Sequence, residues 1–254
     1  MKIAIITGAS SGFGKAFAEK IAETGEVDEL WVIARRAERL ARLASELKIA
    51  VRPLALDLGD SRSIKELERL LQEEKPNVRY LVNAAGFGKF GNYNDLTRKE
   101  SLGMIDVNVR ALVAVTLAVL PYMSRGSRLF EIGSSSAFQP LPGFNIYAAT
   151  KAFVLSYTRA LRWELRGRGI HVTAVCPHWL RGTEFFKVAI DTSNGILVKH
   201  WWPALDAALV ANWALLGNKL GLAVVTGGPH TFIHRLAAKL LPSWLIKGIW
   251  RLIR

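Results

Sequence analysis

Thr7-Gly8-Ala9-Ser10-Ser11-Gly12-Phe13-Gly14 joins an apolar run at residues 3–6 to a segment of helical apolar spacing at residues 15–23. Glycines in such a place let the backbone turn tightly and approach a pyrophosphate, whose charge is met by N–H groups at the start of the helix. Glycine between a strand and a helix is also typical of a simple turn, so the loop alone leaves both interpretations open. Its place after the first expected strand favours a dinucleotide loop, formed by Gly8, Ser10, Ser11, Gly12, Phe13 and Gly14.

The rest of the chain alternates short β-branched runs with longer segments of helical apolar spacing. The runs are almost continuously hydrophobic, as in strands that helices cover on both faces. The sequence therefore predicts an α/β fold with a Rossmann-like, doubly wound parallel sheet of about seven strands at residues 1–228, followed by a C-terminal helical tail at 229–254. The expected strands lie near residues 3–6, 29–34, 50–55, 79–83, 128–133, 170–175 and 222–226.

The composition is that of an ordinary globular protein, with 50% hydrophobic and 22% charged residues. A chain of 254 residues buries enough surface to hold a core without disulfides or metals. Cys176 is the only cysteine, which excludes a disulfide framework and favours a reducing compartment, so we expect a cytoplasmic protein. No window reaches about 18 uninterrupted apolar residues, so no transmembrane helix is expected.

The charge balance is strongly basic, with 34 Lys and Arg against 21 Asp and Glu and a formal net charge of +13. Such an excess indicates an anionic partner, which can be nucleic acid, a membrane surface or an acidic carrier protein. The basic residues are dispersed over many expected helices without a recognition motif, which argues against nucleic acid. No acidic residue occurs from Ala207 to Arg254.

The end of the second expected strand bears on the choice of dinucleotide. An acidic residue there binds the ribose 2′-hydroxyl of NAD, whereas an arginine accommodates the 2′-phosphate of NADP. The strand ends Val32-Ile33-Ala34-Arg35-Arg36, without an acid and with two planar cations that suit a phosphate. Since Arg39 and Arg42 continue the pattern at helical spacing, a solvated basic helix start is the alternative. We expect NADP(H), bound through Arg35 and Arg36.

Ser134 is followed by Tyr147, and Lys151 lies four residues beyond the tyrosine. On a helix Tyr147 and Lys151 share a face. A tyrosine of ordinary pKa is a weak acid–base catalyst at neutral pH, and a neighbouring ammonium lowers that pKa by stabilising the phenolate. A bare Tyr-x-x-x-Lys pair is also common as a solvated surface pair, so the surrounding motifs decide its meaning.

Five motifs, in their order and spacing, resemble the short-chain dehydrogenase/reductase family over residues 1–226. They are residues 7–14, Asn83-Ala84-Ala85-Gly86, Asn108, Ser134 and Tyr147-x-x-x-Lys151. The resemblance implies that Tyr147 is the general acid that protonates a carbonyl oxygen, or the base in the reverse direction. Ser134 then hydrogen-bonds that oxygen. Lys151 binds the nicotinamide ribose and lowers the tyrosine pKa, and Asn108 holds a water in a proton relay.

The resemblance also implies cofactor contacts outside the glycine loop. Asp57 and Leu58, after the third expected strand, match the residues near the adenine. Ala84, Ala85 and Gly86, with Asn83, match the segment that supports the cofactor and the central sheet, and Tyr147 and Lys151 touch the cofactor as well.

The segment after the sixth expected strand departs from the family pattern. The family usually has Pro-Gly there, followed by a threonine on the nicotinamide carboxamide. Here His178 replaces the glycine and Thr183 lies one residue later than usual. Pro177 and Thr183 are still expected at the cofactor. His178 is either structural or a second acid or substrate donor.

Two further polar features are notable. His230 and His234 share a helix face but lack a third ligand at suitable spacing, so no metal site is expected. Glu131 lies inside the fifth expected strand, where burial of its carboxylate is costly without a partner, and the sequence offers no account of it.

The segment at residues 178–218 shapes the substrate pocket in the family that this chain resembles. Large aromatic side chains there favour a lipophilic carbonyl over a sugar or a small polar acid. The alternative is that they are ordinary core or subunit interface. The residues concerned are Trp179, Phe185, Phe186, Ile190, Ile196, Leu197, Trp201, Trp202 and Trp213.

Two expected helices and the tail suggest partners. Residues 104–120 and the helix after Tyr147 are apolar over most of their circumference, which predicts a homodimer or homotetramer. In the tail, Lys247, Arg251 and Arg254 form a basic stripe beside tryptophans, as in helices that lie in a membrane interface. The tail could equally dock on a neighbouring subunit or cover the pocket.

The motifs together favour an NADP(H)-dependent oxidoreductase that interconverts a ketone and a secondary alcohol, with a fatty-acyl, steroid-like or other apolar substrate. A 3-oxoacyl carrier-protein reductase is a variant, since a basic surface suits an acidic carrier. A non-catalytic NADP-binding or scaffold protein is the alternative from another class. The location expected is cytoplasmic, with peripheral contact to a membrane through the tail as an open hypothesis.

Overall fold

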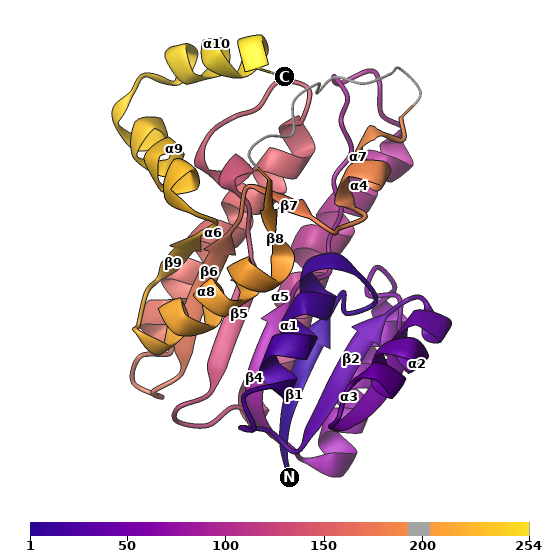
Figure 1. Ribbon diagram of the computed structural model, residues 1–254. Coiled ribbons are helices and arrows are strands. Elements are labelled where there is room, and N and C mark those ends of the chain that lie inside the picture. The colour runs from indigo at the N-terminus through magenta and orange to yellow at the C-terminus, as the bar shows by residue number, and fades with distance from the viewer. Residues whose placement is uncertain (193–203, 254) are drawn as a thin grey trace.

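The computed structural model describes residues 1–192 and 204–253, with side chains described as far as Trp250. Its centre is a parallel sheet of seven strands in the order β3-β2-β1-β4-β5-β6-β9 (Figure 1). This confirms the predicted fold class, and each expected strand begins and ends within two residues of an observed one. The strands are β1 Lys2–Thr7, β2 Glu29–Ala34, β3 Ala50–Ala55, β4 Asn77–Asn83, β5 Arg128–Ile132, β6 His171–Cys176 and β9 Val224–Thr226.

Successive side chains of each strand point to opposite faces of the sheet, and helices bury both faces. In β1, Ile3 and Ile5 pack on one face, while Ala4 and Ile6 pack on the other. The helices α1, α2 and α8 cover the second face, and α3, α5 and α6 cover the first. These helices are α1 Gly12–Ala22, α2 Ala37–Glu46, α3 Ser61–Glu74, α5 Leu112–Val119, α6 Asn145–Glu164 and α8 Ala207–Lys219.

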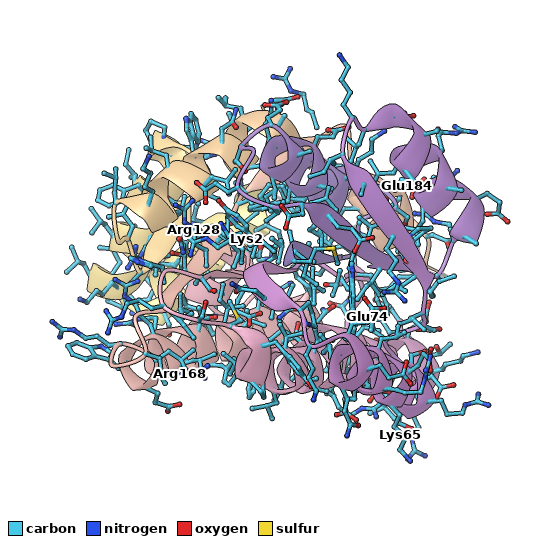
Figure 2. All side chains as sticks on the ribbon, turned by 90° about the horizontal axis from the view of Figure 1, so that it is seen from below. Lys2, Lys65, Glu74, Arg128, Arg168 and Glu184 are labelled. Atoms are coloured by element: carbon cyan, nitrogen blue, oxygen red, sulfur yellow. The ribbon has the colours of Figure 1, made fainter. Side chains whose placement is uncertain are left out.

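Most charged side chains lie outside these layers, with Lys65 and Arg168 at the rim of the molecule (Figure 2). The strand order reverses between β1 and β4, and ligands of doubly wound folds bind in the crevice at such a point, beyond the carboxyl ends of the strands. The loops after β1, β4, β5 and β6 are therefore the ones that build a site.

A helical stretch of 25 residues, Arg98–Tyr122, is long and apolar enough to cross a membrane by length and composition alone. It consists of α4 Arg98–Ile105, the π-helical η1 Asp106–Ala111, α5 and the 3-10 turn η2 Leu120–Tyr122. Val115 and Val119 of this stretch are fully buried in the core beside the sheet. Packing within the fold thus accounts for part of its apolar character, since 39% of its most apolar window is buried.

The outer faces of α5 and α6 carry exposed apolar side chains. Leu117 on α5 is 59% exposed, and Phe153 and Trp163 on α6 are 43% and 73% exposed. These are the surfaces from which the sequence predicts a homodimer or homotetramer, and that association stays a prediction.

A second, two-stranded parallel sheet pairs β7 Trp179–Arg181 with β8 Ala204–Asp206. Sequence reasoning missed both strands because each has only three residues and neither interrupts the surrounding apolar pattern. Between them, α7 Phe185–Ile190 follows β7 and packs near the end of α6 that carries Tyr147. The substrate-shaping segment therefore has its own small framework beside the main sheet.

The tail forms two helices, α9 Pro229–Leu240 and α10 Ser243–Ile253, which project from the main body (Figure 1). One side of α10 returns to the body. Ile246 and Trp250, four residues apart, are 5% and 8% exposed, and the Trp250 indole N–H donates a hydrogen bond to the Pro142 carbonyl at 2.9 Å. Since Trp250 joins the cluster around Phe144 and Tyr147, it fixes α10 against the body.

Replacement of Trp250 by Ala should free α10. Loss of a buried tryptophan costs about 3–5 kcal/mol, and here that energy holds one helix to the body. Trypsin should then cleave after Lys247 at least about tenfold faster than in the parent protein, as followed by mass spectrometry. Trp244→Ala is the matched control, because Trp244 lies on the same helix and is 69% exposed. Equal cleavage rates in the two variants would contradict the anchoring role.

Candidate active site

The glycine loop between β1 and α1 packs directly against the chain that leaves β4. Gly8 has φ +68°, and a Cβ atom placed on it would lie 2.8 Å from the Ala84 carbonyl oxygen. A Cβ atom on Gly14 would lie 2.4 Å from the Gly8 carbonyl oxygen. The Ala85 N–H also donates to the Thr7 hydroxyl at 3.0 Å. The loop therefore keeps its shape only with glycine at positions 8 and 14, and it lies beside the Asn83–Gly86 segment.

Of the two arginines expected at the cofactor, Arg36 reaches the glycine loop. Its guanidinium donates to the Ser10 hydroxyl at 3.2 Å and to the Ser11 hydroxyl at 3.0 Å. Arg35 is exposed. The Arg36 side chain thus lies over the loop, which places a fixed cation at the end of β2.

Arg36 also forms an ion pair with Glu184, which sequence reasoning missed. The Glu184 carboxylate accepts hydrogen bonds of 2.7 Å from both Arg36 and Arg39. These bonds lower the pKa of Glu184 to about 2. The sequence showed Arg39 as part of a basic helical pattern. Glu184 lies 145 residues further along the chain and belongs to no motif, so nothing in the sequence indicated that it pairs with these arginines.

Of the other predicted cofactor residues, Thr183 borders the same loop, and the rest make contacts elsewhere. Thr183 lies over Gly12, where a Cβ atom would meet the threonine Cβ at 3.2 Å. The Pro177 carbonyl accepts a hydrogen bond from the Ser135 N–H at 2.8 Å. Asp57, after β3, accepts the Gly59 N–H at 3.0 Å and so closes a local turn, and Leu58 beside it is buried in the core. Phe13 packs edge-to-face on Phe17 inside α1, at 4.9 Å between ring centroids.

Tyr147 and Lys151 occupy one face of α6, as the four-residue spacing predicts, and both are buried at 7% and 5% exposure. The Lys151 ammonium donates to the Ile132 carbonyl at the end of β5, at 2.7 Å. Ser134 begins the short helix η3 Ser135–Phe138 and forms a side-chain hydrogen bond with Tyr147. The carboxyl end of β5 thus brings Ser134, Tyr147 and Lys151 together.

Asn108 joins this group from the π-helical turn η1. Its amide accepts from the Phe87 N–H at 3.0 Å, and donates to the Phe87 carbonyl at 2.9 Å and to the Thr150 hydroxyl at 3.1 Å. A Cβ atom on Gly86 would lie 2.9 Å from the Asn108 carbonyl oxygen and 3.5 Å from the Lys151 ammonium. Single π turns inside helices occur often at functional sites, and this one was not predicted from the sequence.

The pKa of Tyr147 is raised, whereas the helical pairing with Lys151 alone predicts a lowered one. Burial of the ring raises the pKa more than the hydrogen bond with Ser134 lowers it. The Lys151 ammonium lies 5.7 Å from the centre of the tyrosine ring and is bonded to Ile132 instead. Burial also lowers the pKa of Lys151, to about 8. In this form of the protein Tyr147 therefore holds its proton at neutral pH.

A cavity of about 350 Å³ opens next to Ser134. The described side chains around it include hydrophobic residues of the tail, and also three histidines. His178 bonds to the Ser135 hydroxyl at 3.0 Å, and burial together with the nearby His230 and His234 lowers the pKa of His178 to about 4. The lining consists of Ser134, Ser135, Ser136, Gln139, Leu141, Phe144, His178, Trp179, His230, Thr231, His234, Ala237, Leu241, Ile246, Ile249 and Trp250.

The predicted aromatic wall divides between two locations. Trp179 lines the cavity, and the Phe185 ring lies 5.3 Å from the Tyr147 ring, while Phe186 packs on Trp179 at 5.3 Å. Trp213 packs instead against the core cluster of α1 and α8. Ile190 joins the cluster around Tyr147, and Ile196, Leu197, Trp201 and Trp202 lie outside the described residues. Within the described ranges, no group of three or more His, Cys, Asp or Glu side chains could hold a metal ion.

This geometry agrees with comparison to known proteins. The family model for short chain dehydrogenases matches residues 2–193. The chain belongs to the short-chain dehydrogenase family. It is 38% identical to a sulfoacetaldehyde reductase of Chromohalobacter salexigens, over 91% of this chain and 90% of that protein.

Two solved structures of dehydrogenases resemble the whole chain. One, from Sphingobium yanoikuyae in complex with NADPH, is 30% identical, with a TM-score of 0.79, and the match covers 100% of this chain and 97% of that one. The bulky-bulky ketone specific alcohol dehydrogenase of Comamonas testosteroni is 27% identical, with a TM-score of 0.75 and coverage of 100% and 95%. The chain is therefore an oxidoreductase that acts on alcohol or carbonyl groups.

Glu131, for which the sequence offered no partner, lies fully buried in β5 below the site. Its Oε1 accepts the Asn83 amide at 3.2 Å and lies 2.8 Å from the Thr116 hydroxyl. That hydroxyl also lies 2.7 Å from the Leu112 carbonyl, to which it can donate its single proton. A proton on the carboxyl then completes the contact with Thr116. Burial raises the pKa of Glu131 to about 8, which agrees with a neutral acid.

A buried carboxyl with a raised pKa makes stability depend on pH. The folded protein holds this proton up to about pH 8, whereas the unfolded chain releases it near 4.5. The stabilising contribution is thus complete below 4.5 and is lost as pH rises through 8. Glu131→Gln mimics the neutral acid and cannot lose a proton, so this variant should lose less stability as the pH rises. It should melt several degrees above the parent protein at pH 9.

Glu164→Gln is the control for this comparison, because Glu164 is exposed on α6. Thermal unfolding between pH 5 and pH 9 measures both variants. A pH profile for Glu131→Gln parallel to that of Glu164→Gln would show that the buried carboxyl is not the titrating group.

Proposed function

We propose that the chain is an NADP(H)-dependent oxidoreductase that interconverts a lipophilic ketone and a secondary alcohol. The observation that carries the proposal is the cavity beside Ser134, whose surface is formed mostly by apolar atoms and whose described lining contains no Lys, Arg, Asp or Glu. An apolar pocket with a few convergent polar groups at one end is the usual form of a site for a small apolar ligand.

The glycine loop fits a dinucleotide. The contacts at Gly8 and Gly14 leave no room for a Cβ atom, so the backbone forms a side-chain-free surface at the start of α1, where N–H groups meet a pyrophosphate. Arg36 supports the 2′-phosphorylated form, because β2 ends without an acid and this guanidinium lies over Ser10 and Ser11. The related structure in complex with NADPH supports the same choice.

The catalytic step is a proton transfer at Tyr147. When bound, the nicotinamide supplies the hydride for reduction or accepts it for oxidation. Tyr147, protonated at neutral pH, gives its phenolic proton to the substrate oxygen during reduction, and the Ser134 hydroxyl bonds to the same oxygen. Lys151, buried beside the tyrosine, stabilises the phenolate that remains. Asn108 holds the backbone of Phe87 and thereby fixes the segment next to Gly86, which faces Lys151.

The absence of charge around the described cavity argues against an anionic substrate. A buried carboxylate or sulfonate needs a cationic partner, and the three histidines have lowered pKa values, so they are neutral at pH 7. The related bulky-bulky ketone specific alcohol dehydrogenase supports a ketone as the substrate. The sulfoacetaldehyde reductase is related to this chain by sequence, but a substrate with a sulfonate is not one that this uncharged cavity favours.

A series of methyl ketones of increasing chain length tests the substrate class. With NADPH as reductant, kcat/KM should rise by roughly fourfold for each added methylene, the factor that corresponds to about 0.8 kcal/mol of burial, until the cavity is filled. A ketone of equal length with a terminal carboxylate is the matched control and should be a poor substrate. Better turnover of the carboxylated ketone would overturn the assignment.

Tyr147→Phe tests the chemistry separately from binding. The variant should lose about 10²–10⁴-fold in kcat, because it removes the general acid, while calorimetry should give an unchanged affinity for NADPH. If the parent protein binds NADPH but reduces neither these ketones nor a 3-oxoacyl carrier protein, the non-catalytic alternative replaces the proposal.

A further inference from the structure

The turn between α9 and α10 carries a compact group of exposed apolar side chains, termed here the apolar corner. Leu240 is 77% exposed, Leu241 41%, Trp244 69% and Leu245 36%. Figure 1 shows this turn, in yellow, at the outer edge of the molecule. Monomeric soluble proteins seldom leave several large apolar side chains together in water, so the corner indicates a contact with another surface.

Cations flank the corner. Lys239 precedes Leu240, Lys247 follows Leu245, and the described residues place neither lysine in an ion pair with a carboxylate. No Asp or Glu occurs anywhere from Ala207 to Arg254. A second copy of this chain, docked by two-fold symmetry, would place the same cations against each other, because such an interface pairs the same patch on both subunits. The charges are complementary to an anionic surface instead.

We propose that the apolar corner docks on an anionic lipid membrane. Leu240, Trp244 and Leu245 enter the interface between headgroups and acyl chains, where tryptophan is favoured, and Lys239 and Lys247 lie among the anionic headgroups. The opposite side of α10, with Ile246 and Trp250, stays packed on the body, so the helix needs no rearrangement to bind.

The docking surface and the cavity share one structural element. Leu241, Ile246, Ile249 and Trp250 line the cavity from the same turn and helix that carry the corner. A membrane-bound protein would therefore have this cavity wall at the lipid interface, where lipophilic ketones concentrate. This last link rests on the proposed function, whereas the docking itself does not.

Co-sedimentation of the full-length protein with vesicles, without substrate or cofactor, tests the proposal. Vesicles of phosphatidylcholine and phosphatidylserine at 3:1 should bind the protein at least about tenfold more strongly than pure phosphatidylcholine. Leu240→Ser with Trp244→Ser should reduce binding at least about tenfold, and so should Lys239→Gln with Lys247→Gln. Neither Leu240 nor Trp244 lines the cavity, so the pocket is retained.

Trp163→Ser on α6 is the matched control, since Trp163 is equally exposed at 73% but lies outside the tail. It should leave vesicle binding unchanged. The proposal fails if the parent protein stays in the supernatant, if the corner variant binds as well as the parent, or if Trp163→Ser loses binding to the same extent. Conversion of an oligomer to a monomer by the corner substitutions, without any vesicle binding, would assign the surface to a second copy.

A separate observation concerns Glu184. Its carboxylate lies between Arg36 and Arg39, in hydrogen bonds of 2.7 Å to each, and thus occupies a donor of the same Arg36 guanidinium that the proposed function assigns to the 2′-phosphate. Carboxylate and phosphate bind arginine through the same planar fork. Both anions beside one guanidinium would repel each other.

We infer that Glu184 competes with the 2′-phosphate for Arg36 and leaves when the phosphorylated cofactor binds. Glu184 directly precedes α7, whose first residue, Phe185, packs 5.3 Å from the Tyr147 ring. Release of Glu184 therefore frees the segment that borders the tyrosine. The inference rests on the proposed use of NADP(H).

Calorimetric titration with 2′,5′-ADP, which carries the 2′-phosphate, and with ADP, which lacks it, tests this inference without turnover. Glu184→Gln should bind 2′,5′-ADP about threefold or more tightly than the parent protein and bind ADP unchanged. Glu46→Gln is the matched control, because the Glu46 carboxylate pairs with the Lys15 ammonium at 2.7 Å and not with Arg36. Unchanged or weaker binding of 2′,5′-ADP by Glu184→Gln overturns competition.

Arg36→Ala separates this failure from a failure of the proposed function. If Arg36→Ala loses the preference for 2′,5′-ADP while Glu184→Gln gains nothing, the cofactor assignment stands and the role of Glu184 falls. If Arg36→Ala keeps the preference, the assignment of the phosphate to Arg36 is wrong, and with it the basis of the competition.

Discussion

The contact between Gly8 and Ala84 is the constraint on which the rest of the site depends. No side-chain atom fits between them, so the loop after β1 and the segment after β4 meet backbone to backbone. The Ala85 N–H bonded to Thr7 locks the same contact. From there the chain runs to Gly86, which touches Asn108 and Lys151, and Lys151 lies beside Tyr147. The dinucleotide loop and the catalytic group are thus parts of one packed unit.

That unit contains two buried ionisable groups at the carboxyl end of β5. Lys151 is held by the Ile132 carbonyl, and Glu131 below it shares hydrogen bonds with Asn83 and Thr116. Burial raises the pKa of Glu131 to about 8, so its carboxyl is neutral at pH 7, and lowers the pKa of Lys151 to about 8, so its ammonium keeps its charge there and is held by the Ile132 carbonyl. Two apolar side chains would be buried here at a lower cost in free energy. The presence of two ionisable groups instead fits a site that has to move a proton.

The sequence predicted the main sheet well because its strands are buried on both faces and read as continuous apolar runs. The four-residue spacing predicted that Tyr147 and Lys151 share a helix face, and the family resemblance implied that Ser134 joins them. It did not predict η1, β7 or β8, whose residues differ little from those of ordinary helix or loop. The direction of the Tyr147 pKa depends on burial, which a helical spacing does not reveal.

Glu184 illustrates a further limit. Arg36 was expected to meet an anion, and it does, but the anion is supplied by a residue that only the fold of the substrate-shaping segment brings near. The tail illustrates another. Its helical pattern allowed a pocket cover, a subunit contact or a membrane contact. The inner side of the tail covers the pocket, since Ile246 and Trp250 pack on the body, whereas the packing does not choose a partner for the outer side.

The division of labour between segments follows from this packing. The catalytic side chains lie at the carboxyl end of β5, on α6 and on η1, within the central sheet and its covering helices, and have little freedom to vary. The cavity is lined on one side by η3 and the loop that leads to α6, and on the other by β7, α9 and α10, which lie outside that sheet. Substitutions in the tail can therefore change substrate preference while the proton-transfer geometry stays intact. The apolar corner lies on the outer side of the same tail, so the proposed membrane docking would not disturb the catalytic residues.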